Sequence, residues 1–326
     1  MSLPYLARLA CLSLAAFFVV HLALGVLVLA LTPWAVRLAG RIAPVRAARF
    51  LLMLRLFPAG AALFLVVGLC TPSYLWLEPK GESEPMGLAC LLAVALCVSI
   101  GGVSLTRAAR ALARSLGHIR QCRQVSRETR LPGERAAAWV MDGGAPCVML
   151  AGVLRPRLVI SRNVVAALSA EQLSAVIRHE RAHGRSHDNL KRLLVLLAPD
   201  LLPFFPAFRS IERAWARISE WAADDGAAAG KARRSLSLAA ALVRVARLGA
   251  GAAPPALVTS LMADASDLSE RVDRLLRPAN PVARSARREP VLAASGSLLL
   301  AGAMAAVLAQ PATLYSAHEF LEFLIQ

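Results

Sequence analysis

Two histidines and a glutamate stand together in the run His179-Glu180-Arg181-Ala182-His183. Residues four apart are neighbours on one face of a helix, so both imidazoles can point at a single metal ion. Glu180 lies beside them, where its carboxylate can reach a water molecule at the same ion. The H-E-x-x-H spacing therefore predicts a catalytic zinc site, with His179 and His183 as ligands and Glu180 as the general base of a peptidase.

A catalytic zinc site needs a third protein ligand, and the sequence offers three candidates. Glu220 falls on a helix expected over about 211–229, and Asp224, one turn later, can hold the ring N–H of a ligating histidine. His187 extends the histidine series, but one straight helix spreads three such residues over about two turns. We therefore expect His187 beside the site, in its second shell, or at the membrane surface. Glu212 lacks the E-x-x-x-D spacing, so Glu220 is the favoured ligand.

The elements that must position these residues can be predicted from the sequence before the motif. Ser169 and Gln172 have the spacing of a capping box, so a helix is expected to begin there and run through His183. A basic helix is expected from Thr106 to about Arg127. Between the two helices, short apolar runs alternate with turn-forming residues, which is typical of a small sheet. The expected strands are Ala137–Met141, Pro146–Ala151 and Arg157–Ser161.

The composition indicates a membrane protein rather than a soluble enzyme. Of the 326 residues, 57% are hydrophobic, and the mean hydropathy is +0.55. The net charge of +16 also suits a nucleic-acid binder, but aromatic residues are sparse and no nucleic-acid motif is present, so direct nucleic-acid binding is not expected. The six cysteines have no metal or disulfide spacing, and we interpret them as small buried side chains.

Four apolar stretches reach the length of about 20 residues that a helix needs to cross a bilayer. The first exceeds the apolar core of a signal peptide, so we expect a retained anchor. Within it, His21 is expected to be neutral and bonded to a helix neighbour, and Arg55 in the second is expected to snorkel toward water. The stretches cover about 9–36, 51–70, 86–105 and 291–309.

Loop charges predict the orientation of these spans, because arginine and lysine concentrate in cytoplasmic loops. Arginines follow the first and third spans and precede the fourth, whereas three glutamates and one lysine lie between the second and third. The division predicted is three spans within 1–106, a cytoplasmic protease region over 107–288, a fourth span within 289–310 and an external tail over 311–326. Arg8, before the first span, is a contrary charge.

Together these residues resemble the BlaR/MecR family of integral-membrane metallopeptidases, the sensor-transducers of β-lactam resistance and their relatives. The resemblance extends over roughly 1–310. The matching pieces are the H-E-x-x-H motif with His187-Asp188, the stretch Phe204-Phe205-Pro206, Arg217 with Glu220 and Asp224, and the run 152–160 before the zinc helix.

The resemblance implies a mainly α-helical membrane protein of a bacterial cytoplasmic membrane, with a gluzincin-type α+β protease domain on the cytoplasmic side. It assigns Zn²⁺ to His179, His183 and Glu220, and the role of base to Glu180. Family members cleave a cytoplasmic transcriptional repressor, and themselves, when an external signal arrives. A winged-helix repressor is therefore the expected protein substrate, and membrane lipids are expected partners.

This sequence departs from the β-lactam sensors after the fourth predicted span. Only 311–326 follow it, without a penicillin-binding domain, so we expect the signal to come from a membrane partner or from the bilayer. Two alternatives stay open: a housekeeping membrane protease of the HtpX or prenyl-protein-processing type, and a non-catalytic membrane signal transducer. The apolar, proline-rich stretch Leu193–Phe208 is expected either to dip into the membrane interface or to pack around the site.

Overall fold

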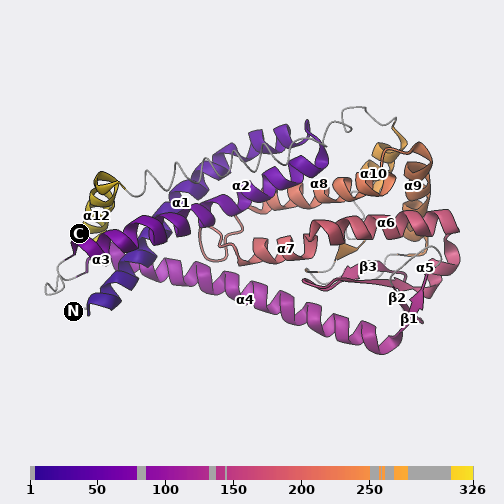
Figure 1. Ribbon diagram of the computed structural model, residues 1–326, viewed down its shortest axis with the longest axis horizontal. Helices are drawn as coiled ribbons and strands as arrows, with labels where there is room; N and C mark the ends of the chain where they lie inside the picture. Colours follow the sequence, from indigo (N-terminus) through magenta and orange to yellow (C-terminus); the bar gives the residue numbers. More distant parts are fainter. Residues whose placement is uncertain are drawn as a thin grey trace.

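The structure, a computed structural model, describes residues 4–78, 86–131, 137–143, 145–249, 257, 259–260, 268–277 and 310–325. Most of these residues are helical, and the long helices run along the longest axis of the molecule (Figure 1). A small sheet with its surrounding helices lies at one end, and the two chain termini lie at the other (Figure 1). The molecule therefore consists of a bundle of long helices and, at one end, the sheet with its surrounding helices, here called the α+β end.

Three helices in the described part of the chain are long and apolar enough to cross a bilayer. The predicted spans over about 9–36 and 51–70 fall within them, and the span over about 86–105 does so from Leu88 onward. Most of their apolar side chains face outward, as expected for a surface that lipid covers. They are α1 (Tyr5–Ala39), α2 (Pro44–Leu65) continued by the π-turn η1 (Val66–Cys70) and α3 (Thr71–Leu77), and α4 (Leu88–Val125).

At the terminal end of the molecule, a buried ion pair accounts for the contrary charge of Arg8. Its guanidinium lies 2.8 Å from Glu78 Oε1, and Arg8 is buried, so the charge is neutralised inside the protein. Helix α12 (Pro311–Ile325) packs at the same end, where Ser73 Oγ donates to the Leu314 carbonyl at 3.0 Å. The predicted tail is thus helical over its described residues.

The predicted fourth span, over about 291–309, lies outside the described residues. Helix α10 (Leu268–Leu276) precedes this part of the chain and lies at the sheet-bearing end, whereas α12 follows it and lies at the terminal end (Figure 1).

The sheet has five strands among the described residues, in the order β1-β2-β4-β3-β5. Strands β2 and β4 pair in parallel, and the other neighbours pair antiparallel. The strands are β1 (Ser126–Arg130), β2 (Ala137–Met141), β3 (Val148–Ala151), β4 (Arg157–Ser161) and β5 (Thr259–Ser260). The three predicted strands are confirmed, with β3 beginning two residues later than expected, whereas β1 and β5 were not predicted.

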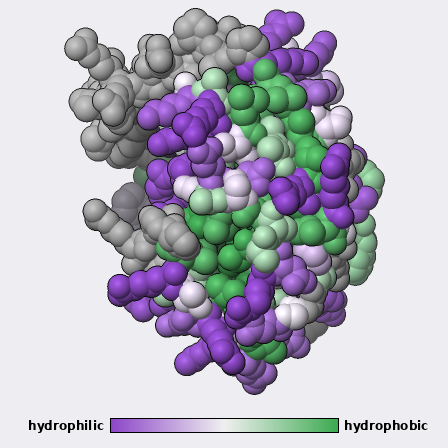
Figure 2. Space-filling model, turned by 90° about the vertical axis from the view of Figure 1, so that its right-hand side faces the viewer, coloured by the Kyte–Doolittle hydropathy of each residue, from purple (hydrophilic) through white to green (hydrophobic). Residues whose placement is uncertain are grey.

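One face of the sheet carries the core of the α+β end. Helix α6 (Ala170–Ser186) packs through Leu173, Val176 and Ile177 against this face and against α9 (Ala232–Arg247). The remaining helices there are α5 (Arg162–Ala167), α7 (Asp188–Leu197) and α8 (Arg209–Ala228). Figure 2 faces this end of the molecule: hydrophilic side chains lie over much of its periphery, and hydrophobic side chains gather nearer the middle. The surface is therefore mixed, unlike the lipid-facing sides of the long helices.

The segment 198–208, here named the α7–α8 linker, is held by polar side chains from the membrane helices. His21 on α1 places Nε2 3.3 Å from the Asp200 carbonyl oxygen. Arg107 on α4 donates from a terminal nitrogen to Asp200 Oδ2 at 2.7 Å. The expectation that His21 bonds within its own helix was therefore wrong: its partner lies 179 residues further along the chain.

Arg55 on α2 binds the same region and does not snorkel. Its side chain is 2% exposed, and Nε donates to Glu212 Oε1 at 2.7 Å. Another nitrogen donates to the Ala198 carbonyl at 3.0 Å, and the guanidinium lies 4.5 Å above the centre of the Phe208 ring. Burial replaces snorkelling because α8 supplies a carboxylate, and the linker supplies carbonyls and an aromatic face beside the helix.

Candidate metal centre

Helix α6 carries the H-E-x-x-H motif, and its ends follow from local sequence. Ser169 accepts from the Gln172 backbone N–H, and the Gln172 side chain accepts from the Ser169 N–H, which confirms the predicted capping box. The helix ends at Ser186, and the residue that follows, His187, has a left-handed φ of 57°. Asn189 then donates to the carbonyls of Leu150 and Gly152, so the start of α7 is fixed against β3.

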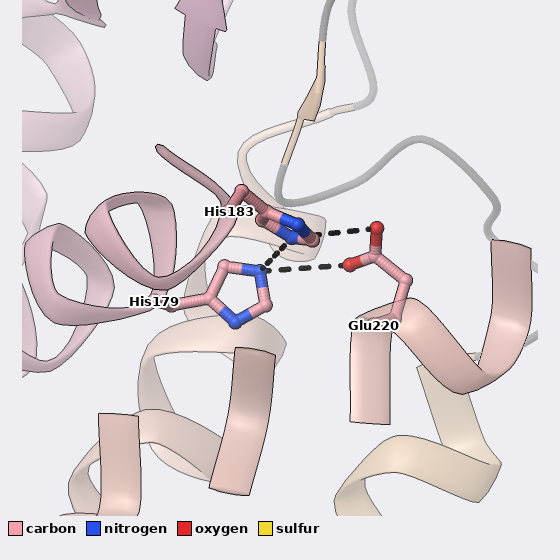
Figure 3. Close-up of side chains that lie close together, drawn as sticks. All are labelled: His179, His183 and Glu220. Carbon is pink, nitrogen blue, oxygen red and sulfur yellow. Dashed lines mark hydrogen bonds and ion pairs between the residues drawn. The ribbon is translucent and has the colours of Figure 1, made fainter. Parts of the chain in front are cut away.

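Helix α8 brings Glu220 to the two histidines. A Cβ built on Gly226 would lie only 3.2 Å from the Ala182 Cβ, so this glycine lets α8 approach α6 closely. His179 and His183 point from one helix and Glu220 from the other toward a common point (Figure 3). The two Nε2 atoms are 3.2 Å apart, and each lies 3.5 Å from an oxygen of Glu220.

Two aspartates hold the outer nitrogens of these imidazoles. Asp188 Oδ2 is hydrogen-bonded to His183 Nδ1 at 2.7 Å, and Asp224 Oδ1 lies 2.9 Å from His179 Nδ1 in a less well aligned contact. A carboxylate at Nδ1 fixes the tautomer in which Nε2 carries a lone pair. Both histidines are therefore oriented with Nε2 toward Glu220. Asp188 was not predicted in this role, although it directly follows His187.

Arg271 on α10 completes the polar shell and was not predicted at all. Its guanidinium binds Asp224 through two bonds of 2.8 and 3.0 Å and lies 3.3 Å from Glu220 Oε2. Arg271 is 4% exposed, so the ion pair is buried. No motif marks this residue, because it follows Asp224 by 47 positions and lies in a short polar helix. The amphipathic spacing of Leu268–Leu276 is the only local signal.

Glu180 is fully buried beside the cluster. Neither of its carboxylate oxygens has a hydrogen-bond partner among the described residues. Burial raises its pKa to about 7, in spite of the nearby His179 and His183. A carboxylate with a pKa near neutrality and free lone pairs is suited to accept and return a proton.

The charges of the three clustered groups are strongly coupled. Burial alone lowers the pKa of His183, but the Glu220 and Asp188 carboxylates outweigh it and raise this pKa to about 10. Burial alone raises the pKa of Glu220, but the His183 and His179 rings and Arg271 hold it well below its ordinary value. Glu220 is therefore a carboxylate near neutral pH, as a metal ligand must be.

The donor set fits a zinc ion. The nearest approaches of Glu220 to the two rings, 3.5 Å each, exceed the 2.7–2.9 Å that is typical of charge-assisted hydrogen bonds. The two Nε2 atoms are 3.2 Å apart, a distance at which one ring must carry a proton there unless a cation lies between them. A cation between two imidazoles and a carboxylate resolves both features, and this ligand set is typical of catalytic zinc.

The other candidates lie outside the cluster. His187 is exposed, with Nδ1 3.1 Å from the Arg185 carbonyl oxygen, because the left-handed turn at the helix end points it away. Asp188, not His187, supports His183 from this turn. Glu212 is bound to Arg55 and is therefore not a ligand in this arrangement.

Comparison with known families identifies the class of protein. The model of a membrane-associated metallopeptidase family, described as BlaR1 peptidase M56, matches residues 82–275, a range that includes the whole cluster and Arg271. The chain belongs to this family, which confirms the resemblance found in the sequence. Members are typically zinc-dependent. A search of curated proteins found no match.

Proposed function

We propose that this chain is a membrane-embedded, zinc-dependent endopeptidase. The observation that carries the proposal is the meeting of His179, His183 and Glu220 beside Glu180, whose carboxylate has no partner among the described residues. Zinc bound by the first three residues would supply a Lewis acid that polarises a peptide carbonyl and lowers the pKa of a water molecule.

The chain's own residues then have distinct tasks. Glu180 takes a proton from the attacking water and returns it to the leaving amine, which its pKa of about 7 permits in both directions. Asp224 and Asp188 keep the imidazoles of His179 and His183 in the ligating orientation. Arg271 balances the charge of Asp224 and of Glu220 inside the protein.

We also propose that the α+β end faces the cytoplasm of a bacterial inner membrane. Arginines gather at the turn between α1 and α2 with its adjoining helix ends, and in the C-terminal half of α4, as expected on that side. The positions of α10 and α12 at opposite ends of the molecule support a fourth crossing between them (Figure 1). The proposed substrate is a cytoplasmic protein such as a winged-helix repressor, and signal transduction is the proposed purpose of the cleavage.

Metal content and cleavage test this proposal together. The detergent-purified wild type is expected to hold about one zinc per chain. A His183→Ala variant should bind little zinc. A Glu180→Gln variant should bind zinc as the wild type does, but should cleave neither its own chain nor an unfolded test protein such as casein. His187→Asn is the matched control, because asparagine tolerates the left-handed turn and His187 lies outside the cluster.

The outcomes also separate the alternatives. Negligible zinc in folded wild type would refute the metal centre. Zinc without any cleavage that depends on Glu180 would favour a non-catalytic transducer, and cleavage of many unfolded membrane proteins would favour a housekeeping protease.

A further inference from the structure

A groove of about 810 Å³ lies between α4 and the α7–α8 linker, apart from the metal centre. Residues of α4 from Val98 to Arg110 form one side, and Asp200 to Arg209 form the other. None of the clustered metal-binding residues lines it. Apolar side chains include Val98, Val103, Leu202 and Phe204, and the basic ones are Arg107, Arg110 and Arg209.

The groove crosses the level at which α4 leaves the apolar environment. The α4 sequence is apolar from Leu88 to Leu105 and then carries arginines, beginning with Arg107 and Arg110. A helix with this pattern places the transition at the lipid headgroups. One end of the groove therefore lies at the depth of acyl chains and the other at the depth of phosphates, whichever side of the membrane the α+β end occupies.

The charged end of the groove is positive. Asp200 is the acidic residue that lines it, and Arg107 already binds this carboxylate at 2.7 Å. The Arg110 and Arg209 side chains are exposed and have no hydrogen bond or ion pair to any described residue. Two arginines are thus available to an anion at this depth.

The lip of the groove is apolar and strained. Phe204 is 88% exposed and has a φ of 63°, a left-handed conformation that bulky side chains rarely adopt. Leu202 and Phe205, which pair in an isolated antiparallel β-bridge, are also exposed. Exposed aromatic and aliphatic side chains beside arginines match the interface of a bilayer, where apolar groups enter the acyl region.

We propose that this groove binds an anionic phospholipid, with the phosphate at Arg110 and Arg209 and an acyl chain along Val98, Val103 and Phe204. The predicted fourth span of the chain is the rival occupant. The sequence 291–309 contains no aspartate or glutamate, so it cannot neutralise the two arginines, whereas a lipid phosphate can. Because Arg107 links the groove to Asp200, the bound phosphate lies next to the linker that joins the two ligand-bearing parts of the metal site.

Native mass spectrometry of the detergent-purified chain measures the binding. Phosphatidylglycerol and phosphatidylcholine of equal chain length are titrated against wild type, against the pair Arg110→Gln with Arg209→Gln, and against Arg120→Gln with Arg123→Gln. The last pair is the matched control, since both arginines are exposed on α4 outside the groove and the charge change is equal. At roughly 1 kcal/mol per arginine near an anionic lipid, the first pair should bind phosphatidylglycerol about 30-fold more weakly.

The proposal stands if wild type and control prefer phosphatidylglycerol and the Arg110 and Arg209 pair loses this preference. The proposal is overturned if the wild type binds both lipids equally, or if both double variants lose the same amount of affinity for phosphatidylglycerol. The predicted fourth span would then be the favoured occupant of the groove. If millimolar inorganic phosphate displaces phosphatidylglycerol from the wild type, the groove is a site for free anions and the proposal is overturned. Unchanged elution in size-exclusion chromatography and unchanged zinc content verify that each variant is folded. If the double variant does not fold, the single variants Arg110→Gln and Arg209→Gln replace it, and each should bind phosphatidylglycerol about fivefold more weakly. The result is independent of peptidase activity.

Discussion

Two arginines on helix α10 allow a test of how burial changes the contribution of an ion pair to the free energy of unfolding. Arg271 and Arg274 each bind an aspartate of α8 through two short bonds, to Asp224 and to Asp225. The Arg271 and Asp224 side chains are 5% and 1% exposed, whereas those of Arg274 and Asp225 are 28% and 40% exposed. The two pairs share a helix and a residue type, and they differ in contact with water. Arg271 binds through two nitrogens and also lies near Glu220, whereas Arg274 binds both Asp225 oxygens through one nitrogen.

Replacing Arg271 by glutamine leaves the buried carboxylate of Asp224 without its counter-charge. Removal of one partner from such a pair costs about 3–5 kcal/mol of the free energy of unfolding. For a protein of this size, that corresponds to a fall in melting temperature on the order of 10 °C. Arg274→Gln should cost less than about 1 kcal/mol, because water screens the exposed pair.

Thermal unfolding in detergent, followed by tryptophan fluorescence, measures both variants with zinc and with a chelator. Trp221 on α8 contacts Arg274, and Trp215 lies on the same helix, so their fluorescence reports the unfolding of α8. A double variant, Arg271→Gln with Asp224→Asn, should recover part of the lost stability, because the unpaired charge is gone. Equal shifts for Arg271→Gln and Arg274→Gln, or no recovery in the double variant, would refute the argument from burial.

Further predictions concern catalysis, the metal and the membrane helices. Glu180→Gln should lower the cleavage rate about 10²–10⁴-fold at unchanged zinc content, and equal activity would exclude it as the base. Asp188→Asn should weaken zinc affinity about 10–100-fold in competition with a chelator, while His187→Asn leaves it unchanged. Removing zinc that is present at 100 times its Kd should cost about 2.7 kcal/mol of stability, and an unchanged melting temperature would contradict the site. Arg55→Met should lower the melting temperature by several degrees, whereas Arg49→Met, at an exposed position near the start of the same helix, should not.

Local signals predicted the elements that carry the motif. The capping box at Ser169 and Gln172 gave the start of α6, because its hydrogen bonds involve only neighbouring residues. Turn residues around the apolar runs gave β2, β3 and β4 in nearly the observed bounds. The edge strand β1 escaped prediction, since the residues Ser126–Arg130 are mostly polar and largely exposed and have no apolar alternation.

Residues that act through distant partners could not be found in this way. Arg271 is one of 37 lysines and arginines, and only the fold brings it to Asp224. Arg55 and His21 looked like isolated polar residues in apolar spans, for which snorkelling and local bonding are reasonable defaults. Their partners on the α7–α8 linker lie more than 140 residues away in sequence.

The contacts of the α7–α8 linker have a consequence for any attempt to excise the protease. Leu201 and Phe208 pack in one apolar cluster with Val28 and Leu51 of the membrane helices. A fragment that begins at residue 107 would therefore expose part of its own interior to water, and it would leave Glu212 without Arg55 and the Asp200 carbonyl without His21. The first two long helices thus supply part of the hydrophobic core beneath the linker, and a water-soluble fragment would need a redesigned surface in their place.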